Sequence, residues 1–68
     1  AYPNDRTLIQ HGYNFLRMND LPEADYFFQT AIKLFPDSWR AYEGLSKVHA
    51  ARNDVESARQ MLSRAQTI

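Results

Sequence analysis

Apolar side chains recur at helical spacing along the chain, most clearly between residues 21 and 34. A pattern of i, i+3, i+4 and i+7 places its members on one side of a helix. In this stretch the pattern is followed by Ala24, Phe27, Phe28, Ala31 and Leu34. It predicts an amphipathic helix over residues 21–34.

Three further stretches show the same periodicity and predict helices at about residues 5–18, 38–51 and 55–67. Short polar segments separate the four stretches, so consecutive helices are expected to be antiparallel neighbours. The inner positions expected for these three helices are Leu8, Ile9, Gly12, Phe15 and Leu16; Tyr42, Leu45, Ser46 and His49; and Ala58, Met61, Leu62, Ala65 and Ile68.

The helix boundaries have matching signals. Asn4 and Asp5 precede the first helix as capping residues. Asp20 is expected to cap the second helix, with Glu23 three residues later as in a capping box. Pro36 ends that helix and excludes Phe35 from helical geometry.

The second half of the chain repeats the frame of the first half after 34 residues. Asn-Asp turns, small residues and large apolar residues return at the same places. The identical pairs at this period are Arg6 and Arg40, Asn19 and Asn53, Asp20 and Asp54, Ala24 and Ala58, and Ala31 and Ala65.

A 34-residue period of two helices resembles the tetratricopeptide repeat. The resemblance covers the whole chain and rests on Leu8, His11, Gly12, Phe15, Ala24, Phe28, Ala31 and Pro36 in the first copy, and on Tyr42, Leu45, Ser46, His49, Ala58, Leu62 and Ala65 in the second. It implies one all-α domain over residues 1–68, built from two tandem repeats at about 5–38 and 39–68 whose four antiparallel helices form a fragment of an α-solenoid.

The same resemblance implies a scaffold that holds a partner's peptide or helix in a concave groove lined by the first helix of each repeat. An aromatic side chain beside cations suits a peptide with an acidic group or a C-terminal carboxylate. The alternative is an ordinary solvated helix face. The residues expected at the groove are Arg6, Ile9, Gln10, Tyr13, Arg17, Arg40, Glu43, Gly44 and Lys47.

Two specialised members of this broad class fit less well. Repeats that clamp acidic chaperone tails carry a Lys followed four residues later by an Asn, a pair that is missing here. Trp39 and Tyr42 also resemble the half-a-tetratricopeptide repeats of RNA-processing assemblies, but Ser46 stands where that family has Glu. An RNA-processing scaffold therefore ranks below a peptide-binding one.

The last helix presents apolar residues to a neighbour that does not follow in the sequence. Either the parent protein continues or the surface is covered by a second copy, which makes homodimerisation the structural alternative. Residues 1–38 carry three basic and five acidic side chains, and residues 39–68 carry five and three, which suits head-to-tail association. The self-association end comprises Met61, Leu62, Ala65 and Ile68.

Composition argues against several other functions. Eight basic and eight acidic residues cancel, so no charge footprint favours nucleic acid. The chain has no cysteine nucleophile, no phosphate-binding glycine loop and no acid–base pair, so an enzyme and a cofactor are not expected. His11 and His49 are interpreted as packing residues rather than metal ligands.

The length of the apolar segments and the first residue of the chain indicate its cellular and protein context. No apolar run approaches the roughly 20 residues that cross a bilayer. The chain begins at Ala1 rather than at an initiator Met, which suggests a fragment of a longer protein. The compartment is left open, with the cytoplasm as the default.

Overall fold

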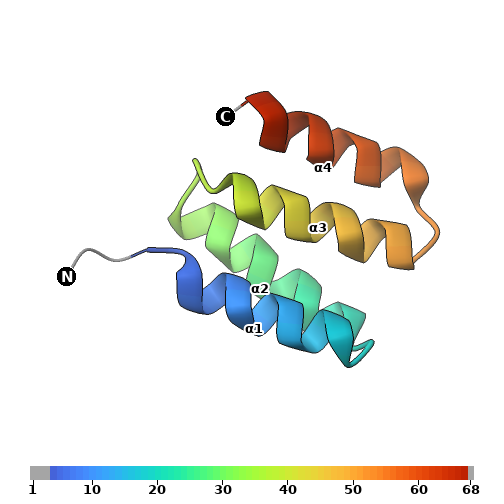
Figure 1. The fold of residues 1–68 in the computed structure, drawn as a ribbon, viewed down its shortest axis with the longest axis horizontal. Coiled ribbons are helices and arrows are strands. Elements are labelled where there is room, and N and C mark those ends of the chain that lie inside the picture. The colour runs from blue at the N-terminus through green and yellow to red at the C-terminus, as the bar shows by residue number, and fades with distance from the viewer. Residues whose placement is uncertain (1–3, 68) are drawn as a thin grey trace.

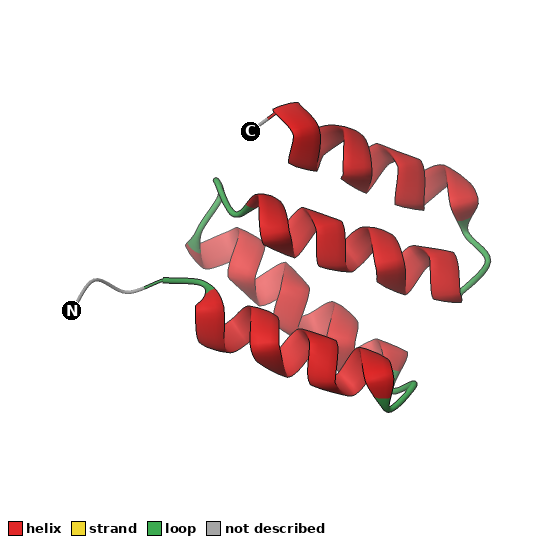
Figure 2. Cartoon of the chain, viewed as in Figure 1, coloured by secondary structure: helices red, strands yellow, loops and turns green. Residues whose placement is uncertain are grey.

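A computed structural model describes residues 4–67 of the chain. It contains α1 (Arg6–Arg17), α2 (Leu21–Leu34), α3 (Trp39–Ala51) and α4 (Val55–Thr67), shown in Figure 1. Within the described residues only helices and loops occur (Figure 2). The predicted all-α fold is confirmed, and the expected bounds differ by one residue at each end of α1 and at the start of α3.

The helices pack as two adjacent antiparallel pairs, α1 with α2 and α3 with α4 (Figure 1). Helix α3 also packs against α2 and, more lightly, against α1, so it joins the two pairs. Among residues 4–67, α4 packs against α3 alone. The last helix therefore has one neighbour where α3 has three.

In each helix pair, the turn between the two helices contains an asparagine in the left-handed backbone conformation. Asn19 has φ of 59° and Asn53 has φ of 63°. In the first turn the Asn19 amide donates to the Leu16 carbonyl at 3.0 Å and the Asp20 amide to the Phe15 carbonyl at 2.8 Å. This is the Schellman arrangement, which satisfies the carbonyls at the end of a helix. Equivalent bonds close the turn after α3.

The aspartate after each asparagine begins the next helix. The Asp20 carboxylate accepts from the Glu23 amide at 3.4 Å, which confirms the predicted cap. The Asp54 carboxylate accepts from the Ser57 amide at 3.2 Å. Hydrogen bonds from the hydroxyl and the amide of Ser57 lower the pKa of Asp54. The repeated Asn-Asp pair therefore ends one helix and starts the next within two residues.

Replacing Asn19 with alanine should lower the free energy of unfolding by about 1 kcal/mol, because an L side chain other than Asn or Asp is strained at positive φ. Asn19→Gly should leave stability unchanged or slightly higher, since glycine adopts this conformation freely. Urea denaturation followed by circular dichroism measures both. Equal stability of the alanine and glycine variants would contradict this role of the turn.

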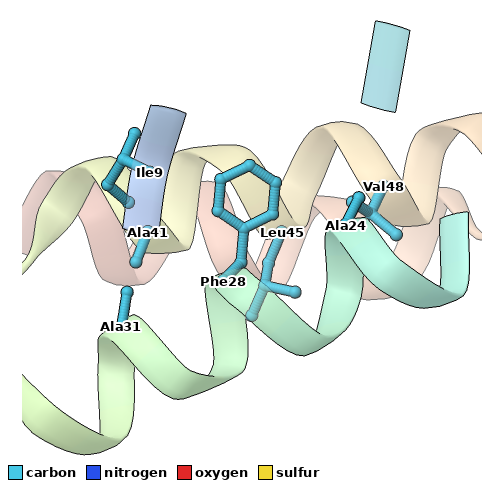
Figure 3. Packing of buried hydrophobic residues seen from close by; sticks show 7 residues of the cluster. All are labelled: Ile9, Ala24, Phe28, Ala31, Ala41, Leu45 and Val48. Atoms are coloured by element: carbon cyan, nitrogen blue, oxygen red, sulfur yellow. The ribbon is translucent and has the colours of Figure 1, made fainter. Parts of the chain in front are cut away.

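The core is organised around Phe28, whose ring is fully buried (Figure 3). A Cβ atom built on Gly12 of α1 would lie 2.6 Å from the ring, and one built on Gly44 of α3 would lie 2.3 Å from it. Only glycine leaves room for the ring at these two places. The buried cluster consists of Ile9, Ala24, Phe28, Ala31, Ala41, Leu45 and Val48.

Three expectations about burial were wrong. Gly44 was placed at the groove but is buried against Phe28. His11 was placed inside but is exposed, with its ring 5.3 Å from that of Phe27. Leu34 is 60% exposed because it lies in the last turn of α2, on the side of Phe27 rather than of the buried Phe28.

The buried face of α3 is also wider than expected. Ala41 and Val48 are fully buried, although the pattern assigned neither to the inner face. The reason is that α3 packs against helices on two sides, so a single apolar stripe underestimates its contact surface.

Candidate functional site

The residues expected at the groove differ in accessibility. Ile9 is 7% exposed and belongs to the core. Tyr13 and Glu43 are half-buried. The exposed members are Arg6, Gln10, Arg17, Arg40 and Lys47.

A pocket forms where α1 and α3 begin, and it is lined by Asn4, Asp5, Arg6, Ile9 and Arg40. The two helices start at the same end of the molecule (Figure 1). The structure thus brings together three of the expected groove residues, one with an apolar side chain and two with guanidinium groups, in one pocket lining. Gln10, Arg17 and Lys47 are not part of this pocket lining.

Polar contacts connect the beginnings of the two helices. The Ser38 hydroxyl donates to the Asp5 carboxylate and accepts from the Ala41 amide at 3.2 Å. The Asn4 side chain accepts from the Arg6 amide at 2.9 Å. Asn4 therefore caps α1, as expected, whereas the Asp5 side chain makes no capping bond and instead joins α1 to α3.

The pocket carries more positive than negative charge. Its lining contains two arginines and one aspartate, and the aspartate already accepts from Ser38. The N-termini of α1 and α3 add the positive ends of two helix dipoles. Arg40 also lies over the ring of Trp39, with 5.0 Å between its guanidinium carbon and the ring centroid. Trp39 is 45% exposed beside the pocket.

Asn4 and Asp5 were not expected to line a site. Sequence reasoning assigned them to helix capping alone, since Ser and Asx residues before a helix are normally explained by their caps. The signal that could have found them is the 34-residue period, because it places Asn4 and Ser38 at the same point of the two repeats.

Tyr13 is half-buried against the core rather than exposed on the groove surface. Its ring meets that of Phe28 edge-on, with centroids 5.2 Å apart and an angle of 78°. Burial, and secondarily the charge of Glu43, raises the pKa of Tyr13 above 10.0. Its hydroxyl therefore stays protonated at neutral pH and remains a hydrogen-bond donor.

The apolar surface expected on the last helix is partly open. Leu62 is 41% exposed, and Met61 and Ala65 are half-buried. Val55 at the start of α4 is 60% exposed. Ile68 lies outside the described residues.

Other kinds of site find little support in the part of the chain that the structure describes. Residues 4–67 contain no cluster of three or more His, Cys, Asp or Glu side chains able to hold a metal ion. None of the described helices has the length and apolar character needed to cross a bilayer.

A comparison with protein-family models identifies the family of the chain. Residues 15–67 match the family model described as tetratricopeptide repeat. The chain belongs to the tetratricopeptide repeat family. Tetratricopeptide repeats are generally protein–protein interaction modules and are typically non-catalytic. Comparisons with curated proteins and with solved structures give no match.

Proposed function

We propose that this tetratricopeptide repeat module binds a peptide segment of a partner protein along the α1 and α3 face, with an acidic group of that segment in the Arg6–Arg40 pocket. The observation that supports this most directly is the pocket itself. Its lining contains one arginine from each repeat together with the apolar Ile9.

The chemistry of the lining favours a carboxylate. Arginine presents planar, paired N–H groups that match the two oxygens of a carboxylate. Ile9 offers apolar contact for the side chain next to that carboxylate. A peptide C-terminus combines both features, because its carboxylate adjoins a side chain.

The competing interpretation is that the two arginines are solvated surface residues. The two readings predict different behaviour when charge is removed from the pocket. A solvated face tolerates the loss of both cations, whereas a binding pocket loses its ligand.

The test selects short synthetic peptides with free C-terminal carboxylates from a random library on the immobilised chain. Selected peptides are then measured by fluorescence anisotropy against the intact chain. Arg6→Glu combined with Arg40→Glu should weaken binding by about 10- to 30-fold, since each exposed ion pair that is lost contributes up to about 1 kcal/mol. C-terminal amidation of the peptide should have a similar effect.

A matched control reverses two arginines elsewhere. Arg59→Glu with Arg64→Glu makes the same change in net charge on α4, away from the pocket lining. This control should bind as the unmodified chain does. Equal losses in both double variants would show that only overall charge matters, and the pocket assignment would fail.

A further inference from the structure

Glu43 is a half-buried carboxylate on α3, and no other described side chain neutralises it. Arg40 and Lys47 lie three and four residues away on the same helix, yet no ion pair within residues 4–67 involves Glu43. The hydroxyl of Ser46 donates to the backbone carbonyl of Glu43 and leaves its carboxylate free. A carboxylate that has lost part of its water gains from a cation brought by a ligand.

The α1 side of the same region is formed by Tyr13. Its ring meets the buried Phe28 edge-on, which fixes its position. Burial raises the pKa of Tyr13, and the charge of Glu43 adds to this effect, so the two side chains lie near each other. The helices that carry them, α1 and α3, also pack against each other. Tyr13 and Glu43 therefore form a second polar place on the α1 and α3 face, next to the pocket.

The spacing along α1 matches that of an extended peptide. Ile9 in the pocket lining and Tyr13 are four residues apart, so they lie on the same side of α1 with a rise of about 6 Å between them. In an extended peptide every second side chain points to the same face, at intervals of about 6.6 Å. A C-terminal side chain on Ile9 therefore brings the third residue from the C-terminus to Tyr13.

The position of the pocket sets the direction of the peptide. The pocket lies where α1 and α3 begin, and a C-terminal carboxylate is the last group of its chain. The peptide stays on the α1 and α3 face only if it runs from the pocket towards the C-terminal ends of these helices. On this path it passes Tyr13 and Glu43.

We propose that Tyr13 and Glu43 select a Lys or Arg at the third position from the C-terminus of the bound peptide. The aliphatic part of that side chain packs on the Tyr13 ring, and its cationic head donates to the Glu43 carboxylate. This inference rests on the proposed function, because the Arg6–Arg40 pocket sets the register of the peptide. It adds a specificity that the pocket does not provide, since two arginines favour any free C-terminal carboxylate.

The sign of the preference distinguishes this contact from a solvated Glu43. If Glu43 were only a surface carboxylate, the nearby Arg40 and Lys47 would favour an acidic residue at this position of the peptide. A preference for a basic residue requires that Glu43 receives it directly.

The test uses N-acetylated pentapeptides with free C-terminal carboxylates, titrated into the isotopically labelled chain and followed by nuclear magnetic resonance. Gln-Gln-Arg-Gln-Leu should bind about 3- to 5-fold more tightly than Gln-Gln-Gln-Gln-Leu, on the scale of a partly exposed ion pair. Gln-Gln-Gln-Arg-Leu has the same composition as the first peptide, but its arginine points to the opposite face. It should bind no more tightly than the all-glutamine peptide.

Two substitutions test the role of Glu43. Glu43→Gln keeps the size of the side chain and should abolish the preference for arginine. Glu43→Lys should reverse it in favour of Gln-Gln-Glu-Gln-Leu. Glu56→Lys is the matched control, because it makes the same change in charge at an exposed position of α4. It should leave the preference unchanged.

The outcomes separate this inference from the proposed function. Binding that needs the free carboxylate but shows no preference at the third position, or favours Glu there, overturns this inference alone. An equal gain from arginine at the second and third positions would show that only overall charge matters and would also overturn it. If none of the peptides binds in a way that depends on its free carboxylate, both proposals fail.

Discussion

Replacing Phe28 with alanine should lower the free energy of unfolding by about 3–5 kcal/mol, as is usual for a fully buried aromatic ring. Phe28 contacts the backbone at Gly12 and Gly44 and supports Tyr13 edge-on, so its loss opens a cavity shared by three helices. Small domains have a total stability of only about 5 kcal/mol or slightly more. We therefore expect a largely unfolded chain, measured by urea denaturation with circular dichroism.

Two further variants serve as controls for this measurement. Phe28→Leu retains part of the contact and should give a folded chain of intermediate stability. Tyr26→Ala removes an aromatic ring that is 62% exposed on the same helix and should change stability by less than about 1 kcal/mol. Similar losses at Phe28 and Tyr26 would show that the core is not centred on the Phe28 ring.

Adding one methyl group at Gly44 should destabilise the fold by about 1–3 kcal/mol. The new Cβ would lie 2.3 Å from a carbon of the Phe28 ring, and this ring has no free space to move into because Gly12 lies close on another side. The loss is measured as a shift in the urea midpoint of Gly44→Ala relative to the unmodified chain.

The same argument predicts a partial rescue. Combining Gly44→Ala with Phe28→Leu should cost less than the sum of the two single changes, because the smaller side chain accommodates the methyl group. The second repeat offers a natural parallel, with Ser46 and Leu62 in the places of Gly12 and Phe28. Strict additivity of the two changes would contradict a direct contact between position 44 and the ring.

The sequence allowed most of the fold to be predicted, because its signals are local and repeated. Asn19 and Asp20 return as Asn53 and Asp54, and each pair forms the same turn and begins the next helix. Helical periodicity then located the helices to within one residue. These features depend on residues that are close together along the chain, so they can be recognised directly in the sequence.

Burial around α3 was harder to predict, because it depends on contacts between distant residues. Gly44 resembled a groove residue since nothing near it in the sequence indicates the Phe28 ring. Val48 is fully buried on a helix that packs against three others. Its burial follows from how the two repeats pack, and a periodic pattern in one helix does not report that.

The pocket was predictable only in part. The arginines at positions 6 and 40 stood out as an identical pair at the repeat period, and the structure places both in one pocket lining with Ile9. The bond between Asp5 and Ser38 connects residues 33 positions apart. No local pattern predicts such a bond, although it fixes one wall of the pocket.

The most direct test of the proposed binding site is a nuclear magnetic resonance titration of the isotopically labelled chain with a peptide selected for a free C-terminal carboxylate. The pocket assignment predicts that amide shifts concentrate at Arg6, Ile9 and Arg40 and that they disappear with the amidated peptide. Shifts confined to α2 or α4, or unchanged by amidation, would contradict it.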